Sequence, residues 1–160
     1  MTASKVALIT GSAKRRIGWH VADALADRGY AVAIHYNTSA ADAKAVAEEF
    51  RSRGVRCIAV GANLADEQQV RALVRQVLDE FGRIDVLVNC AATWQSKRLE
   101  DVTAGDVRGY LEANTLGTFL CCQQVGLAMV QQPEGGSIIT FGDWAVERPY
   151  LNYAAYFPSK

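Results

Sequence analysis

The chain has 160 residues, half of them hydrophobic, and its 17 basic and 17 acidic side chains give a formal net charge of zero. This length suits one domain with a real core and is short for two. The balanced charge excludes the basic footprint of a nucleic-acid-binding protein, and no apolar run approaches the roughly 20 residues that span a bilayer. The N-terminus, residues 1–5, lacks the apolar region of a signal peptide. We therefore expect one cytoplasmic domain over residues 1–160, without a nucleic-acid or membrane partner.

Short apolar runs alternate with amphipathic stretches in the first half of the chain. Ser39 with Asp42 resembles a capping box, and Asp66 is placed to cap the following helix. Glycines close the helices, as C-cap residues do. The expected strands are 5–10, 31–36 and 55–60, and the expected helices are 17–28, 39–53 and 66–81.

The same alternation continues in the second half. We expect strands at 84–89 and 137–141 and one long helical stretch at 104–131, opened by Thr103 with Asp106. The strands are short and rich in Val and Ile, as in sheets covered on both faces. Strand–helix alternation with right-handed crossovers predicts a Rossmann-type α/β fold with a doubly wound parallel sheet, of which five strands are present.

The loop after the first strand has the context of a dinucleotide-binding fingerprint. Gly11 permits the tight turn, and Gly18 lets the helix approach the sheet. Helix-start amides around Ile17, together with Lys14, Arg15 or Arg16, would face a pyrophosphate. The alternative is an ordinary glycine turn with solvated basic residues.

The end of the second strand bears on the choice between NAD and NADP. A carboxylate there would accept hydrogen bonds from the adenosine ribose and repel a 2′-phosphate. This segment has no acid and several donors, so it favours NADP(H); the alternative is that its polar residues only solvate a loop. Its residues are His35, Tyr36, Asn37, Thr38 and Ser39.

Tyr156 and Lys160 lie four residues apart, so on a helix both side chains reach the same face. A free tyrosine titrates near pH 10, and an ammonium one turn away favours the phenolate and lowers that pKa. The spacing alone also arises by chance on solvated helices.

In order and spacing, several segments resemble the short-chain dehydrogenase/reductase family. They are Thr10-Gly11 with Gly18, Asn89-Cys90-Ala91-Ala92, Asn114, and Tyr156 with Lys160. The resemblance implies an NADP(H)-dependent oxidoreductase whose proton donor is Tyr156. It implies that Lys160 holds the nicotinamide ribose and lowers the pKa of the tyrosine, and that Asn114 kinks its helix and anchors a water.

The resemblance also implies cofactor contacts at other positions. Asn63-Leu64 stands where the family usually places an aspartate beside the adenine, and Asn89 and Ala91 in the segment after the fourth strand would also contact the cofactor. Thr38 and Cys90 depart from the family pattern, since an arginine and an asparagine are usual there. The first loop carries one extra residue, so either Arg15 or Arg16 takes the place of the family arginine.

One departure from the family pattern bears on the class of substrate. The family's active serine normally lies thirteen residues before the tyrosine, and here that residue is Asp143. Aspartate there, with Trp94 after Ala91, resembles the pteridine reductases, which implies that Arg16, Trp94 and Asp143 contact a pterin-like substrate. The open alternatives are a generic carbonyl or alcohol oxidoreductase and a nucleotide-binding module without catalysis.

The resemblance further implies C-terminal strands beyond Lys160 and a homotetramer or dimer. Without those strands the fifth strand becomes an exposed edge, and we do not expect catalysis by the 160-residue chain alone. No metal site is expected. The four cysteines, for which we expect buried reduced thiols, are Cys57, Cys90, Cys121 and Cys122.

Overall fold

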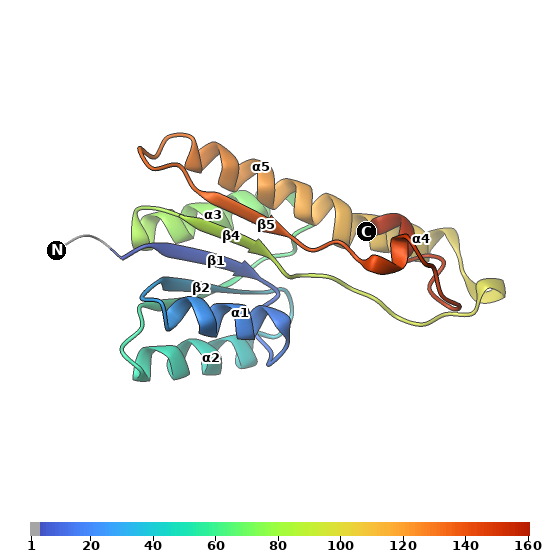
Figure 1. Ribbon diagram of the computed structural model, residues 1–160, viewed down its shortest axis with the longest axis horizontal. Helices are drawn as coiled ribbons and strands as arrows, with labels where there is room; N and C mark the ends of the chain where they lie inside the picture. The colour runs from blue at the N-terminus through green and yellow to red at the C-terminus, as the bar shows by residue number, and fades with distance from the viewer. Residues whose placement is uncertain (1–3) are drawn as a thin grey trace.

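The computed structural model describes residues 4–160, so part of the N-terminal prediction, on residues 1–3, lies outside the described residues. A single parallel sheet has the strand order β3-β2-β1-β4-β5. Its strands are β1 (Val6–Thr10), β2 (Ala31–Tyr36), β3 (Cys57–Gly61), β4 (Val86–Asn89) and β5 (Ser137–Thr140). The chain builds outward from β1 to β3 and then crosses to β4 on the other side of β1 (Figure 1). The predicted doubly wound α/β fold is confirmed.

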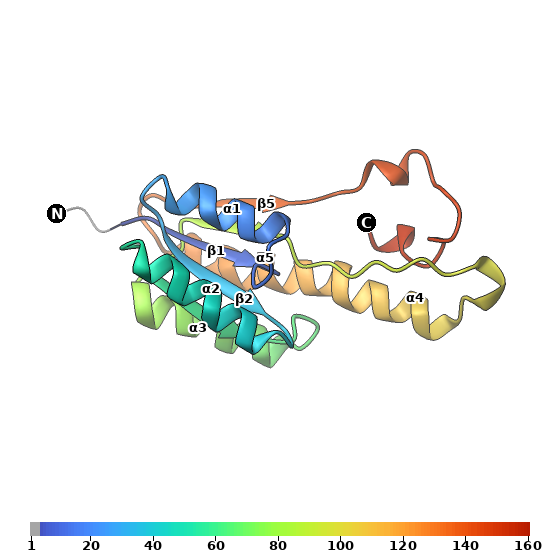
Figure 2. The same cartoon turned by 90° about the horizontal axis from the view of Figure 1, so that it is seen from below.

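Helices cover both faces of the sheet (Figures 1 and 2). The long ones are α1 (Ile17–Ala26), α2 (Ala40–Ser52), α3 (Glu67–Phe81) and α5 (Gly117–Met129). Alternate residues of β1 face two separate cores: Ala7 and Ile9 pack with α1 and α2, whereas Val6 and Leu8 pack with α3 and α5. This double burial explains why β1 reads as a continuous apolar run.

The predicted single helix over 104–131 is interrupted. α4 (Ala104–Tyr110) passes into a π turn, Leu111–Leu116, before α5 begins. A π turn accommodates one extra residue, and here it contains the buried Asn114. The expected kink therefore takes the form of a local widening of the helix.

Two of the three predicted helix caps are present. Thr103 and Asp106 form a full capping box, and Asp66 accepts hydrogen bonds from the first turn of α3. Ser39 makes no side-chain cap on α2, so that part of the prediction is wrong. The hydroxyl of Ser39 therefore makes no capping hydrogen bond to the first turn of α2.

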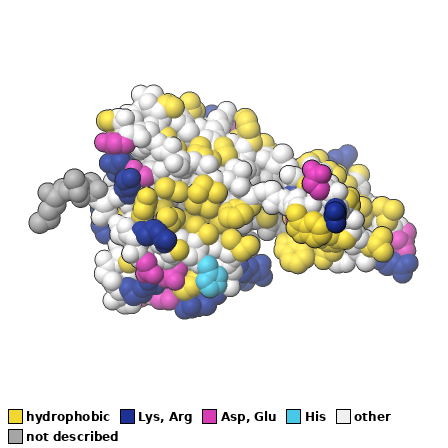
Figure 3. Space-filling model, viewed as in Figure 1, with side chains coloured by type: hydrophobic (Ala, Val, Ile, Leu, Met, Phe, Trp, Pro, Cys, Tyr) yellow, Lys and Arg dark blue, Asp and Glu magenta, His cyan; other side chains and the backbone are white. Residues whose placement is uncertain are grey.

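β5 forms one edge of the sheet, as expected. Ile138 and Ile139 are 39% and 46% exposed, and hydrophobic side chains gather over this region in Figure 3. Beyond the carboxyl ends of the strands, α4 and the C-terminal turns project away from the sheet (Figures 1 and 2). No helix among residues 4–160 is long and apolar enough to cross a membrane.

Candidate active site

A cavity of about 470 Å³ lies at the carboxyl ends of the strands. It opens where β1 neighbours β4 although they are distant in the chain, which is the point where strand order reverses. Arg15 and Asn114 do not line it. The predicted residues that do are Gly11, Arg16, Ile17, Gly18, His35, Tyr36, Asn37, Thr38, Ser39, Asn63, Leu64, Asn89, Ala91, Trp94, Asp143, Tyr156 and Lys160.

The first loop is shaped by two close backbone approaches. Gly11 has φ +64°, and a Cβ there would lie 2.7 Å from the Cα of Ala91. A Cβ on Gly18 would lie 2.7 Å from the carbonyl oxygen of Gly11. Such distances exclude any side chain unless the backbone moves. Gly11 therefore makes the tight turn predicted for it, whereas the close approach at Gly18 is to the first loop and not to the sheet.

Gly11→Ala is expected to lower the free energy of unfolding by about 3 kcal/mol, measured by urea denaturation. The left-handed backbone costs about 1–2 kcal/mol for a non-glycine residue, and the overlap with Ala91 adds a similar amount. Gly29→Ala is the matched control, because Gly29 has φ +83° but a Cβ there would meet nothing within 4 Å. Equal destabilisation by both substitutions would contradict the close packing of Gly11 on Ala91.

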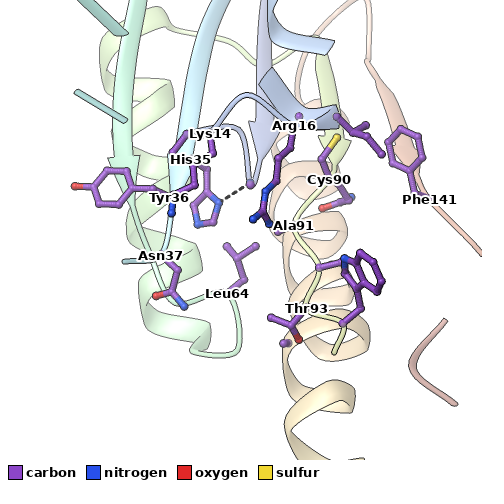
Figure 4. A pocket seen from close by; sticks show the side chains of 18 of the residues that line it. Lys14, Arg16, His35, Tyr36, Asn37, Leu64, Cys90, Ala91, Thr93 and Phe141 are labelled. Carbon is purple, nitrogen blue, oxygen red and sulfur yellow. Dashed lines mark hydrogen bonds between the residues drawn. The ribbon is translucent and has the colours of Figure 1, made fainter. Parts of the chain in front are cut away.

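The two arginines of the first loop diverge. Arg15 Nη2 donates to the carboxylate of Glu49 at 2.9 and 3.1 Å, and its guanidinium lies 4.2 Å from the ring centroid of Trp19. Arg16 lines the cavity and is seen there in Figure 4. The geometry therefore favours Arg16, and the predicted contact of Arg15 with a cofactor is not supported because Arg15 joins α1 to α2.

The end of β2 presents polar groups from Asn37 to Ser39 to the cavity. The Ser39 hydroxyl is not used by α2, and Lys14 of the first loop lies close by, 3.7 Å from Asp42. His35 differs from these donors. It is buried, and both of its ring nitrogens already have protein partners, so the prediction that it donates to a cofactor is not supported.

Asn89 is the polar residue at the end of β4. Its Nδ2 lies 3.4 Å from Cys122 Sγ, whereas its Oδ1 is buried without a hydrogen-bond partner among the described residues. A buried oxygen without a donor is costly unless a ligand or water supplies one. Because Asn89 lines the cavity, a bound hydroxyl or N–H group would satisfy this oxygen.

One side of the cavity lies beyond the carboxyl end of β5, and it is lined by Asp143, Tyr156 and Lys160. Tyr156 Oη donates to Asp143 Oδ2 at 2.7 Å, and Lys160 Nζ donates to the carbonyl oxygen of Phe141 at 2.6 Å. Tyr156 and Lys160 flank a short 3-10 turn, Phe157–Ser159, instead of sharing the face of an α-helix. The predicted shared helix face is therefore absent, and hydrogen bonds to Asp143 and Phe141 hold Tyr156 and Lys160 at the cavity instead.

The pKa of Tyr156 is raised, not lowered as the spacing suggested. Burial disfavours the phenolate, and the carboxylate of Asp143 accepts the phenolic hydrogen bond and adds like-charge repulsion. The pKa of Asp143 is lowered by donation from the Ala145 N–H and from Tyr156. The pair is therefore held as a neutral phenol beside a carboxylate.

Asn114 lies behind the cavity wall. Its Nδ2 donates to the Thr93 carbonyl oxygen at 3.0 Å and to Ser159 Oγ at 2.9 Å, and its Oδ1 accepts from the Thr93 N–H at 2.8 Å. These bonds tie the segment after β4 to the turn that carries Tyr156. The anchoring of a water by Asn114 stays a prediction. Ser159 was not predicted, because only the folded chain brings it to Asn114.

Trp94 has one face against Tyr153, with ring centroids 5.7 Å apart and planes 28° from parallel. Its side chain is 59% exposed and lines the cavity. The position suits a stacking contact with a planar ligand. Tyr153 was missed, since the sequence gives no signal that it supports Trp94.

Other cavity residues were also missed. Thr93 and Gly142 directly precede the predicted positions 94 and 143, and that adjacency was the only available signal; Phe141 lies two residues before Asp143. Cys90 lines the cavity too, and burial raises the pKa of its thiol to about 11. Cys57 and Cys121 are buried as predicted, whereas Cys90 and Cys122 are half-buried; all four are free. Among residues 4–160 no cluster of His, Cys, Asp or Glu could hold a metal ion.

Comparison with known protein families gives one match over almost the whole chain. The short chain dehydrogenase profile matches residues 5–160. A 3-oxoacyl-[acyl-carrier-protein] reductase of Staphylococcus aureus is 38% identical over 138 residues, which are 86% of this chain and 56% of that protein. An uncharacterised oxidoreductase of Methylorubrum extorquens is 41% identical over 156 residues, which are 98% of this chain and 61% of that protein.

Solved structures of other proteins also superpose on almost the whole chain. A dehydrogenase/reductase from Sinorhizobium meliloti superposes with a TM-score of 0.90 at 33% identity and covers 99% of this chain and 62% of its own. A short chain dehydrogenase from Burkholderia cenocepacia in complex with NADP gives 0.89 at 34% identity, with 100% and 64% covered. The chain thus spans between 56% and 64% of the length of these proteins.

Proposed function

Because this chain belongs to the short-chain dehydrogenase family, we propose that the protein is an NADP(H)-dependent oxidoreductase in which Tyr156 donates the proton. The observation that carries the proposal is the 2.7 Å contact between Tyr156 Oη and Asp143 Oδ2 at the edge of the cavity. A bound nicotinamide dinucleotide supplies the hydride in such enzymes. We propose this activity for a protein of the length of the relatives, of which the chain spans between 56% and 64%.

The residues present fit a dinucleotide. Gly11, Ile17 and Gly18 line the cavity at the start of α1, where the N-terminus of a helix favours a phosphate group. At the other end of the cavity, the unsatisfied Oδ1 of Asn89 would accept a hydrogen bond from a bound donor. Arg16 would hold the phosphates, Asn63 and Leu64 would border the adenine, and the relative solved with NADP supports the choice of cofactor.

The chain's own residues prepare the proton transfer. A raised pKa keeps Tyr156 in its proton-donating form throughout the physiological range. Lys160 is held by the Phe141 carbonyl beside the cavity, where its ammonium would contact the ribose hydroxyls. Burial lowers the pKa of Lys160, while Asp143 opposes that shift, so the carboxylate favours the charged ammonium.

For the substrate we propose a pterin-like ring reduced at a C=N bond. Asp143 offers a carboxylate to the amino and N–H groups of such a ring, and Trp94 offers a stacking face. The second candidate is a carbonyl or alcohol substrate. It is favoured by the similarity to a 3-oxoacyl-[acyl-carrier-protein] reductase, which fits at least as well as the pterin assignment.

Turnover of a dihydropterin, a 3-oxoacyl thioester and simple ketones, each with NADPH, tests these assignments. Preference for the dihydropterin supports the first, and preference for a carbonyl compound supports the second. Binding of NADPH without turnover of any substrate would indicate a nucleotide-binding module.

We also propose that the protein is cytoplasmic and forms a homotetramer or dimer. Light scattering, which measures the molar mass in solution, tests the oligomeric state.

NADPH is expected to bind at least tenfold more tightly than NADH, which corresponds to about 1.4 kcal/mol. The segment after β2 has no acid, and Lys14 and Ser39 line the same part of the cavity. Lys14→Ala is expected to remove most of this preference by weakening NADPH alone, as measured by calorimetry. Lys44→Ala is the matched control, because Lys44 is exposed on α2 and does not line the cavity. Equal affinity of the unchanged protein for both cofactors would contradict the NADP assignment.

A further inference from the structure

His35 is buried at the carboxyl end of β2 with both ring nitrogens hydrogen-bonded. The Gly11 N–H donates to Nδ1 at 3.1 Å, a bond drawn in Figure 4, and Nε2 lies 3.0 Å from the carbonyl oxygen of Ala62. An N–H facing Nδ1 requires a bare nitrogen there, and a carbonyl facing Nε2 requires a proton. The imidazole is therefore neutral, with its single proton on Nε2.

The backbone of His35 is tied to the same loop. The Ser12 N–H donates to the His35 carbonyl oxygen at 3.1 Å, and the His35 N–H donates to Ser12 Oγ at 3.2 Å. Ser12 Oγ in turn donates to the carbonyl oxygen of Ile9 at 2.7 Å. Residue 35 thus holds the first loop through both its backbone and its side chain, and the Gly11 amide is committed to the imidazole instead of facing a ligand.

We infer that His35 is a positioning residue: its neutral imidazole fixes the first loop in the form that receives a dinucleotide, and a second ring proton releases that loop and weakens binding. The ligand's identity rests on the proposed function, but the hydrogen bond from Gly11 does not. A proton on Nδ1 would face the Gly11 N–H with no acceptor between them. The part-buried Gly11 amide would then lose its partner, and the cavity wall that Gly11 forms would lose its support.

The surroundings of His35 disfavour its charged form. Burial lowers the pKa of the imidazole, and the bond to the Ala62 carbonyl opposes this only in part. The titratable groups that share the cavity with His35 are Lys14 and Arg16 from the first loop, Tyr36 on β2, Cys90 after β4, and Asp143, Tyr156 and Lys160 on the far side; Asn63 to Ala65 contribute none. The two loop cations add no stabilisation to an imidazolium. The folded protein therefore holds fewer protons than the unfolded chain just below pH ~6.5, and stability falls as the pH falls through that window.

Two substitutions separate the roles of the ring nitrogens. The amide oxygen of His35→Asn stands near the place of Nδ1 and can still accept from Gly11, whereas the amide nitrogen of His35→Gln stands near the place of Nε2. Neither side chain titrates. His20→Asn is the matched control, because the chain has two histidines and His20 is exposed on α1. Calorimetric titration with NADP⁺ from pH 7.5 to 5.0 gives the affinities, and the Gly11 amide resonance, followed by NMR over the same range without ligand, reports the loop.

We expect the Gly11 resonance to titrate with the His35 ring, and His35→Gln to bind NADP⁺ about tenfold more weakly at neutral pH. Between pH 7.5 and 5.0 the affinity of the unchanged protein for NADP⁺ should fall more steeply than that of His35→Asn, because only the unchanged protein has an imidazole at position 35 to protonate. This difference cancels the titration of the ligand's own 2′-phosphate, since both proteins bind the same ligand. A Gly11 resonance that does not follow the imidazole, or identical pH profiles for the unchanged protein and His35→Asn, would overturn the inference. Failure of the unchanged protein to bind NADP⁺ at pH 7.5 would instead reject the proposed function, and the NMR titration alone would then decide whether His35 holds the loop.

Discussion

Tyr156→Phe is expected to lower kcat by about 10²–10⁴-fold while leaving the affinity for NADPH nearly unchanged. The substitution removes the hydroxyl that donates to Asp143 at 2.7 Å and retains the ring, which packs edge-on against Tyr110. Because the pKa of Tyr156 is raised, the unchanged protein carries its transferable proton throughout the assay range. Single-turnover kinetics with saturating NADPH measure the loss.

Tyr30→Phe is the matched control for this experiment. Tyr30 packs at the margin of the core formed with α1 and α2 and does not line the cavity. Its hydroxyl therefore cannot contact a substrate or cofactor bound there. Its substitution should leave kcat within twofold of the unchanged value. Retention of more than about a tenth of the activity by Tyr156→Phe would contradict the assignment of the proton donor.

Lys160→Ala should impair both cofactor binding and turnover, since Lys160 lines the cavity beside the same tyrosine.

Asp143→Ser is expected to change the selectivity between a dihydropterin and a ketone by at least about tenfold. Serine cannot supply the charge that would hold the N–H groups of a pterin, but its hydroxyl can still donate to a carbonyl oxygen. In the structure Asp143 also caps the turn Trp144–Val146 by accepting from the Ala145 N–H at 2.9 Å. Serine preserves such a cap, so loss of stability does not explain a change in selectivity.

Trp94→Ala completes this second test. Removing one face of a stacked pair costs about 1 kcal/mol, so the KM for the dihydropterin should rise several-fold without a comparable change in NADPH affinity. Trp144→Ala is the control, because Trp144 is 69% exposed and packs on Tyr150 but does not line the cavity. Unchanged selectivity in both Asp143→Ser and Trp94→Ala would reject the pterin substrate and leave the carbonyl reductase.

Much of the fold could be predicted because its signals are local. The strand at 31–36 was placed at its observed bounds, and the helix expected over 66–81 begins one residue later at Glu67. Buried parallel strands are apolar along their whole length, and amphipathic helices repeat every 3.6 residues, so neighbouring residues carry the information. One error has a tertiary cause: a π turn forms where Asn114 bonds to the distant Thr93 and Ser159. The other is local, since Ser39 makes no side-chain hydrogen bond to the start of α2.

The sequence by itself determined the order of strands and helices, the glycine loop at the carboxyl end of β1, and the identities of Asp143, Tyr156 and Lys160. Only the tertiary structure decided how these groups act on one another. It turned Arg15 toward Glu49, buried His35 between Gly11 and Ala62, and raised the pKa of Tyr156. Spacing along a chain says which side chains can be neighbours within one element. Desolvation and hydrogen bonding depend on what packs against them from other elements, and these set the charge of a buried phenol or imidazole.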